Sequence, residues 1–144
     1  MDNAVLIGPA VEPEDRIGIL IVDDDPAVRD VVHFGMKRRG LRAWTAMDGS
    51  SAVELYRRHR EEIDAVLLDV RMPGMDGPQT LVELQKMQPR IRCCFMSGDL
   101  GGYSEESLLE MGASKVFRKP FLTSDVAEAI VGIVGAGKVS SASR

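Results

Sequence analysis

Side chains able to do chemistry follow four of the five apolar runs in this sequence. They are Asp23, Asp24 and Asp25 after the first run, Asp69 after the third, Ser97 after the fourth and Lys119 after the fifth. Clustered carboxylates repel one another, and a hard divalent cation such as Mg²⁺ relieves that repulsion because it prefers oxygen ligands. One carboxylate can then attack phosphorus while the metal, the amine and the hydroxyl neutralise the phosphoryl oxygens. The residue types therefore indicate metal-assisted phosphoryl transfer.

The apolar runs that precede these side chains alternate with five segments of helical periodicity. The runs cover residues 17–22, 41–46, 65–68, 91–96 and 115–117. Several are continuously apolar, which is typical of strands buried on both faces. The alternation predicts an α/β fold in three layers, with a parallel sheet between two layers of helices. Because ligands bind beyond the carboxyl ends of such strands, we expect the chemical side chains to meet at one edge of the sheet.

Local signals place the ends of the predicted helices. Asp25 is suited to cap the first helix, with Pro26 at its first position and Gly40 after its end. Thr123 or Ser124 is suited to cap the fifth helix, whose apolar stripe ends at Val134. We therefore expect one domain over residues 16–134, an N-terminal tail over 1–15, and a C-terminal tail or linker over the small and polar residues 135–144.

Composition limits the class of protein. The chain has 144 residues, 44% of them hydrophobic, and a net charge of −4, which suits one soluble globular domain. The acidic balance and the lack of a basic cluster argue against direct nucleic-acid binding. No apolar run approaches the roughly 20 residues that span a membrane, and no signal peptide is evident. We expect a cytoplasmic protein in which the adjacent Cys93 and Cys94 are buried free thiols.

Four stretches of the sequence closely resemble the motifs of response-regulator receiver domains, in the order and spacing of that family. They are ILIVDDDP at 19–26, LDVRMPGMDG at 68–77, FMSG at 95–98 and RKPF at 118–121. The resemblance covers about residues 17 to 134. It implies a flavodoxin-like (βα)5 fold with the strand order 2-1-3-4-5, a standard order for doubly wound sheets.

The resemblance also implies a role for each residue of the motifs. Asp69 matches the phosphoacceptor, which would take a phosphoryl group from a phosphohistidine. The implied Mg²⁺ ligands are Asp23, Asp24, Asp69 and the backbone carbonyl of Arg71. Ser97 and Lys119 match the residues that bond the phosphoryl group, and the Lys119–Pro120 peptide bond is implied to be cis.

The same resemblance implies the partners of the domain and the kind of activity it has. A sensor histidine kinase or a histidine phosphotransfer protein would dock near the first helix, and an unknown downstream protein would bind the face of helix 4, strand 5 and helix 5. The domain is expected to be a signalling switch, and to catalyse only its own phosphorylation and dephosphorylation. Val116 departs from the pattern, because many relatives carry an aromatic residue there, and the neighbouring Phe117 would face the other side of the sheet.

Several other interpretations compete with this one. Asp25 could be a third metal ligand instead of a helix cap. A receiver-like domain could also bind partners without being phosphorylated. A phosphatase with an aspartyl nucleophile would want a second acid at the position of Arg71. The resemblance of residues 132–138 to a phosphate-binding loop lacks the required strand–loop–helix context. The sequence leaves open whether the chain acts alone or belongs to a longer regulator.

Overall fold

The computed structural model describes residues 16–142, including side chains as far as residue 135. Its centre is a five-stranded parallel sheet with the order β2-β1-β3-β4-β5. The strands are β1 (Gly18–Val22), β2 (Arg42–Ala46), β3 (Ala65–Asp69), β4 (Cys93–Ser97) and β5 (Lys115–Arg118). The predicted α/β class, the parallel sheet and the strand order 2-1-3-4-5 are confirmed.

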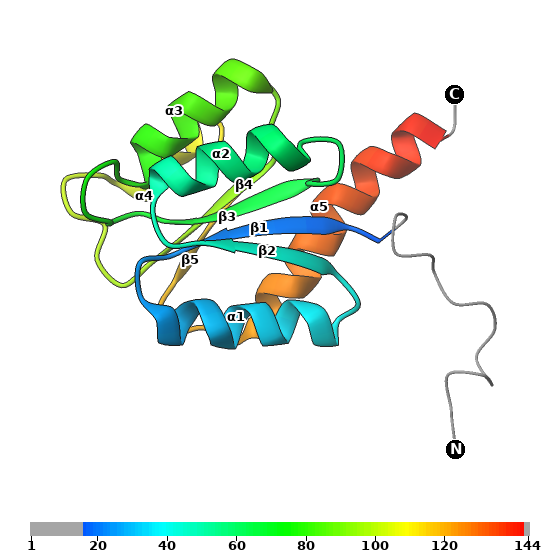
Figure 1. The fold of residues 1–144 in the computed structure, drawn as a ribbon, viewed down its shortest axis with the longest axis horizontal. Helices are drawn as coiled ribbons and strands as arrows, with labels where there is room; N and C mark the ends of the chain where they lie inside the picture. Colours follow the sequence, from blue (N-terminus) through cyan, green and yellow to red (C-terminus); the bar gives the residue numbers. More distant parts are fainter. Residues whose placement is uncertain (1–15, 143–144) are drawn as a thin grey trace.

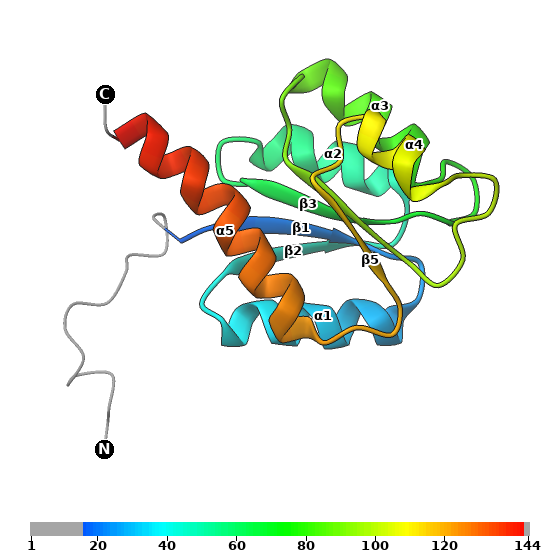
Figure 2. The same ribbon diagram turned by 180° about the vertical axis from the view of Figure 1, so that it is seen from behind.

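Helices cover both faces of the sheet and complete three layers (Figures 1 and 2). One face carries α1 (Pro26–Arg38) and α5 (Thr123–Ala142), which contact each other. The opposite face carries α2 (Gly49–His59), α3 (Gly77–Met87) and α4 (Glu105–Glu110). This arrangement leaves the carboxyl ends of the strands, and the loops that follow them, along one edge of the molecule.

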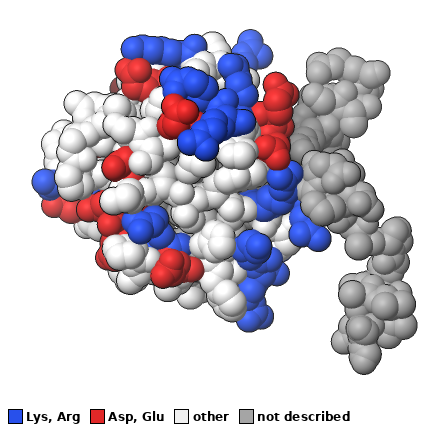
Figure 3. Space-filling model, in the orientation of Figure 1, with Lys and Arg blue, Asp and Glu red and all other residues white. Residues whose placement is uncertain are grey.

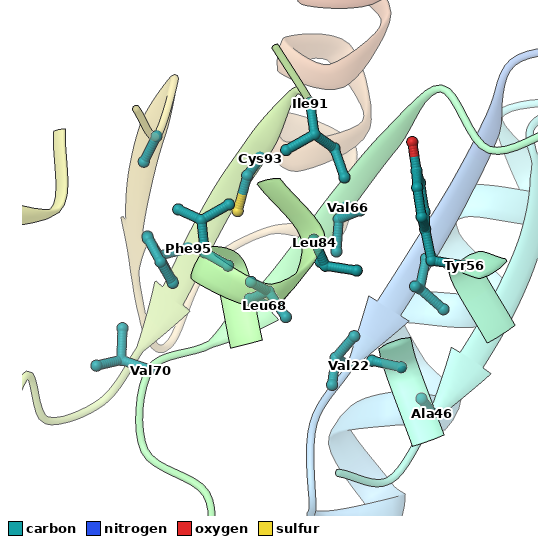
Figure 4. Close-up of a cluster of buried hydrophobic side chains, with 14 of the residues drawn as sticks. Val22, Ala46, Tyr56, Val66, Leu68, Val70, Leu84, Ile91, Cys93 and Phe95 are labelled. Atoms are coloured by element: carbon teal, nitrogen blue, oxygen red, sulfur yellow. The ribbon is translucent and has the colours of Figure 1, made fainter. Parts of the chain in front are cut away.

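The three central strands are buried along their whole length, which explains their continuous apolar sequences. Because side chains alternate across a strand, each strand contributes to two separate cores. Val22, Val66 and Phe95 pack beneath α2, α3 and α4 (Figure 4). Ile19 and Leu67 pack against α1 and α5 on the other face. The strand ends that carry the candidate functional side chains therefore belong to strands that are packed on both faces.

Aspartate caps fix the helices that start near this edge. Asp25 accepts a hydrogen bond from the Ala27 amide at 2.9 Å and caps α1, as predicted. Asp48 caps α2 in the same way through the Ser51 amide. Such caps satisfy amides that have no partner inside the helix, and they set the direction in which the chain leaves each strand.

The fifth helix is longer than the sequence indicated. Its backbone is helical from Thr123 to Ala142, whereas the apolar stripe predicted an end at Val134 and a tail or linker over 135–144. The small and polar composition does not indicate this extension of the helix, because glycine and serine lower helix propensity without ending a helix. No proline occurs after Pro120 to block the backbone hydrogen bonds. The predicted tail over 1–15 lies outside the described residues.

Two further expectations can be compared with the fold. Cys93 and Cys94 are buried free thiols that pack on opposite faces of the sheet, as predicted. Burial raises the pKa of the Cys94 thiol to about 11. Across residues 16–142, no helix combines the length and the apolar character needed to cross a membrane.

Candidate functional site

The predicted functional side chains meet at the carboxyl edge of the sheet. Asp23 directly follows β1, Asp69 ends β3, Ser97 ends β4, and Lys119 directly follows β5. Asp23 and Ser97 are almost completely buried, and Asp69 is 6% exposed. One carboxylate oxygen from each of Asp23, Asp24 and Asp69 lies within 4.8 Å of the others. Parallel strands place their ends side by side, so the topology itself gathers these residues.

Lys119 connects two of the three carboxylates. Its Nζ donates to Asp23 Oδ2 at 2.8 Å and to Asp69 Oδ1 at 3.4 Å. The shorter bond goes to Asp23, which is completely buried. Lys119 thus partly compensates two negative charges and leaves the site with an excess of negative charge.

Burial and this incomplete compensation of charge together determine the pKa values in the site. Burial, followed by the negative charge of Asp23, raises the pKa of Asp69 to about 7. Burial by itself would lower the pKa of Lys119, but the hydrogen bond to Asp23 and the charge of Asp69 raise it overall. A carboxyl group that ionises only near neutral pH is one that a bound cation would stabilise strongly in its charged form.

Backbone contacts hold the two buried aspartates in place. Asp23 Oδ1 accepts a hydrogen bond from the Asp25 amide at 2.9 Å, and Arg29 Nη1 donates to the Asp23 carbonyl at 2.8 Å. Gly77 lies against the backbone of Asp69, where an added Cβ would come within 2.3 Å of the Asp69 carbonyl oxygen. The loop after β3 can return to the site only because residue 77 has no side chain.

Ser97 is directed toward the loop that follows β4. Its hydroxyl donates to the Asp99 carbonyl at 2.7 Å and accepts from the Asp99 amide at 3.0 Å. The Lys119 amide donates to the Ser97 carbonyl at 2.8 Å, which ties the ends of β4 and β5 together. The Lys119–Pro120 peptide bond is cis, as the resemblance implied.

Two contacts across the mouth of the site are not predictable from the sequence motifs. Arg71 Nη1 forms an ion pair with Asp99 Oδ2 at 2.9 Å, and the Tyr103 hydroxyl donates to Asp76 Oδ2 at 3.0 Å. Both contacts join the loop after β3 to the loop after β4. They border a pocket of about 760 Å³. The only sequence signal was that both loops are rich in charged residues and glycine.

Val116 and Phe117 face opposite sides of the sheet, as predicted. Val116 is half-buried against the core beneath α2, α3 and α4. Phe117 is buried on the α1 and α5 side, where its ring centroid lies 6.2 Å from that of Phe121. No aromatic side chain of β5 therefore lies on the Val116 side.

The donor set suits a hard divalent cation. Three carboxylates provide oxygen ligands at one point, one of them exposed (Asp24) and two buried (Asp23 and Asp69). Mg²⁺ is typically bound by one or two carboxylates together with water. Burial, and then the negative charge of Asp23, raise the pKa of Asp69, so a bound cation would stabilise its ionised form. These residues fit the metal that the sequence motifs implied.

Comparison with known proteins agrees with this geometry. The model of the response regulator receiver domain family matches residues 19–131. The chain belongs to this family. Receiver domains are signalling domains of two-component systems, which work with histidine kinases or phosphotransfer proteins and with downstream effectors. The matched region contains β1 from its second residue, the other four strands completely, and all of the gathered side chains.

Solved receiver structures share the fold along most of the chain. A receiver domain protein of Clostridium thermocellum is 25% identical with a TM-score of 0.78, and the match covers 85% of this chain and 98% of that one. CheY in a CheX–CheY–BeF3–Mg²⁺ complex of Borrelia burgdorferi is 28% identical with a TM-score of 0.75, covering 81% and 88%. NtrX of Brucella abortus is 28% identical with a TM-score of 0.78, covering 90% of this chain and 30% of that one.

Proposed function

We propose that this receiver domain accepts a phosphoryl group from a phosphohistidine onto Asp69 in a Mg²⁺-dependent reaction. The observation that supports the proposal most directly is the position of Asp69 beside two further carboxylates, within 4.8 Å, and beside the Lys119 amine at 3.4 Å. A nucleophile for phosphorus, oxygen ligands for a cation and a fixed positive charge thus occur together. The intact set argues against a domain that binds partners without phosphorylation.

The carboxylates of Asp23, Asp24 and Asp69 would hold the metal, together with the backbone carbonyl of Arg71. When bound, Mg²⁺ supplies positive charge that neutralises the phosphoryl oxygens. The chain's own contribution is to present these oxygens from rigid strand ends. The hydrogen bond from the Asp25 amide fixes one side of Asp23 and leaves its carboxylate directed toward the site.

In the transfer step, an Asp69 carboxylate oxygen attacks phosphorus and the phosphorus–nitrogen bond to the donor histidine breaks. The bonding electron pair leaves with the imidazole, and an acyl phosphate remains on Asp69. Lys119 then pairs with a phosphoryl oxygen in place of the Asp69 oxygen that it contacts now. The Ser97 hydroxyl would exchange its bond to the Asp99 carbonyl for a bond to the phosphoryl group.

A groove beside the site suits the phosphohistidine donor. It has a volume of about 460 Å³ and lies between α1 and the segment that follows β5. Val31, which lines the groove, and Leu122, which lies between the lining residues Phe121 and Thr123, are large apolar side chains that are more than half exposed. An amphipathic helix with a histidine at its edge could place its apolar face in this groove. We therefore assign donor docking to α1 and the loop after Lys119.

The face formed by α4, β5 and α5 is proposed to bind the downstream partner. The loop between β4 and α4 connects it to the site, because Ser97 bonds Asp99 within this loop. A phosphoryl group that recruits the Ser97 hydroxyl removes one anchor of the loop. Such a local charge change biases a two-state element, as in other phosphorylation switches.

Intact mass spectrometry tests the phosphoacceptor directly. Wild-type protein and Asp69→Ala are incubated with acetyl phosphate, with Mg²⁺ or with EDTA. We expect one added phosphoryl group in wild type with Mg²⁺ only, and none in Asp69→Ala. Asp30→Ala is the matched control, because it removes an exposed carboxylate of α1. Incorporation that persists in Asp69→Ala would reassign the acceptor. No incorporation in wild type would indicate a receiver domain that is not phosphorylated.

A further inference from the structure

A polar pocket lies at the end of the molecule opposite to Asp69, where β3 and β4 begin. It has a volume of about 400 Å³ and lies between the turn from α2 to β3 and the turn from α3 to β4. The ionisable side chains of its lining are Tyr56, Arg60, Glu61, Asp64, Arg90 and Arg92. Figure 3 shows basic side chains gathered over the α2 and α3 side of the molecule.

Two of the three arginines form no ion pair among the described residues. Arg60 donates to the Met87 carbonyl and so closes the end of α3. By contrast, the guanidinium groups of Arg90 and Arg92 make neither an ion pair nor a hydrogen bond with any residue in the described part of the chain. Arginine presents a planar fork of N–H donors that matches the oxygens of a phosphate group. Two unpaired guanidinium groups that line one pocket therefore suit the recognition of a phosphate group.

The backbone that carries these arginines is fixed. The Ile91 amide donates to the Gln88 carbonyl at 3.0 Å, and the Val66 amide donates to the Arg92 carbonyl at 2.9 Å. Ile91, between the two arginines, is buried in the core. Because the backbone positions are set before any ligand arrives, little ordering entropy is lost there on binding.

Tyr56 brings a hydroxyl group to the same pocket. The residue is 3% exposed, and its hydroxyl, which bonds no other residue among 16–142, is accessible from the pocket. Figure 4 shows this hydroxyl at the end of the ring away from Val22 and Ala46. A tyrosine hydroxyl can donate a hydrogen bond. A ligand oxygen in the pocket could accept it.

We propose that this pocket binds the phosphate group of a small phosphorylated compound that also carries hydroxyl groups. Arg90 and Arg92 would pair with the phosphate oxygens, and the Tyr56 hydroxyl would donate to one of them. Glu61 on the rim would accept from a hydroxyl of the ligand, and its negative charge disfavours polyanions. The volume suits a small metabolite. The site is separate from Asp69 and needs neither Mg²⁺ nor phosphorylation.

An NMR titration of the full chain with ¹⁵N-labelled amides tests the proposal. The probes are ribose 5-phosphate, inorganic phosphate and ribose, each in buffer with EDTA. We expect saturable shifts at residues 56–64 and 88–92 with ribose 5-phosphate, and none with ribose. Inorganic phosphate that binds as tightly as the ester would identify free phosphate as the ligand. Shifts confined to residues around Asp69, or no saturation, would overturn the proposal.

Matched variants distinguish a specific phosphate-binding site from nonspecific attraction of the ligand to positive charge. We expect Arg90→Gln with Arg92→Gln to weaken ribose 5-phosphate binding at least about tenfold, and Tyr56→Phe about threefold. Arg57→Gln with Arg58→Gln is the control, because it also removes two charges, from exposed positions of α2 outside the pocket. It should change the affinity less than about twofold. Equal losses in the two double variants would overturn the site.

Discussion

Replacing Asp69 with asparagine should stabilise the metal-free protein at and above neutral pH. The pKa of Asp69 is raised from an ordinary value of 3.8 to about 7, first by burial and then by Asp23. Between these two pH values the folded protein holds a proton that the unfolded chain has released. Wild-type stability therefore falls as the pH rises through this window, and the loss is complete above pH 7. Asparagine resembles the neutral acid and does not titrate.

The size of this change in stability follows from the ordinary and the raised pKa of Asp69, 3.8 and about 7. At about 1.4 kcal/mol for each pKa unit, the ionised Asp69 carboxylate costs up to about 4 kcal/mol. Lys119 can move closer to Asp23 when its second partner is neutral, so we expect Asp69→Asn to be about 2 to 4 kcal/mol more stable at pH 8. Near pH 4 the difference should almost vanish, because the acid is then neutral in the folded protein.

Urea unfolding in EDTA, measured from pH 4 to pH 8, checks this prediction. Asp30→Asn serves as the control, because Asp30 is an exposed carboxylate of α1 outside the site. The electrostatic reasoning is refuted if Asp69→Asn gains no stability at pH 8, or if its gain does not depend on pH. Mg²⁺ at ten times its dissociation constant should add about 1.4 kcal/mol to the wild type. It should add less to the variant, which lacks one carboxylate ligand.

Two further predictions concern the surroundings of Asp69. Gly77→Ala should destabilise the fold by roughly 2 kcal/mol or more, because the new Cβ would lie 2.3 Å from the Asp69 carbonyl oxygen; urea unfolding would show it, and an unchanged midpoint would contradict the close approach. Lys119→Ala should still bind Mg²⁺, because the three carboxylates remain, but should respond poorly to phosphorylation. Amide NMR shifts of α4, compared in both states with wild type, provide the test, and a wild-type response would remove Lys119 from the switch.

The sequence was sufficient to predict the residues of the site, for a topological reason. Asp23, Asp69, Ser97 and Lys119 each follow an apolar run, and parallel strands bring such positions together whatever the details of packing. The capping role of Asp25 was also predictable, because Pro26 beside it left little choice of helix start. Apolar runs and helix-start residues are local signals in the sequence. The strand ends and the start of α1 depend on such local signals.

Contacts between loops could not be predicted in the same way. The ion pair between Arg71 and Asp99 and the bond between Tyr103 and Asp76 join segments 27 or 28 positions apart. No periodic pattern relates such residues. The pocket with Arg60, Arg90 and Arg92 is a similar case, because the acidic net charge of the chain gives no indication that these arginines line one pocket.

The valine at position 116 determines how the phosphorylation signal could leave the site. A valine side chain has one torsion and a short reach, so it cannot move through the volume that an aromatic ring would sweep. The loop after β4, by contrast, is attached to Ser97 through both the carbonyl and the amide of Asp99. Arg71 holds the side chain of the same aspartate from the opposite loop. If Ser97 turns toward a phosphoryl group, Asp99 loses two bonds at once, and α4 follows this loop directly. The loop, rather than an aromatic side chain of β5, is therefore the route that this chain offers from Asp69 to the face of α4, β5 and α5.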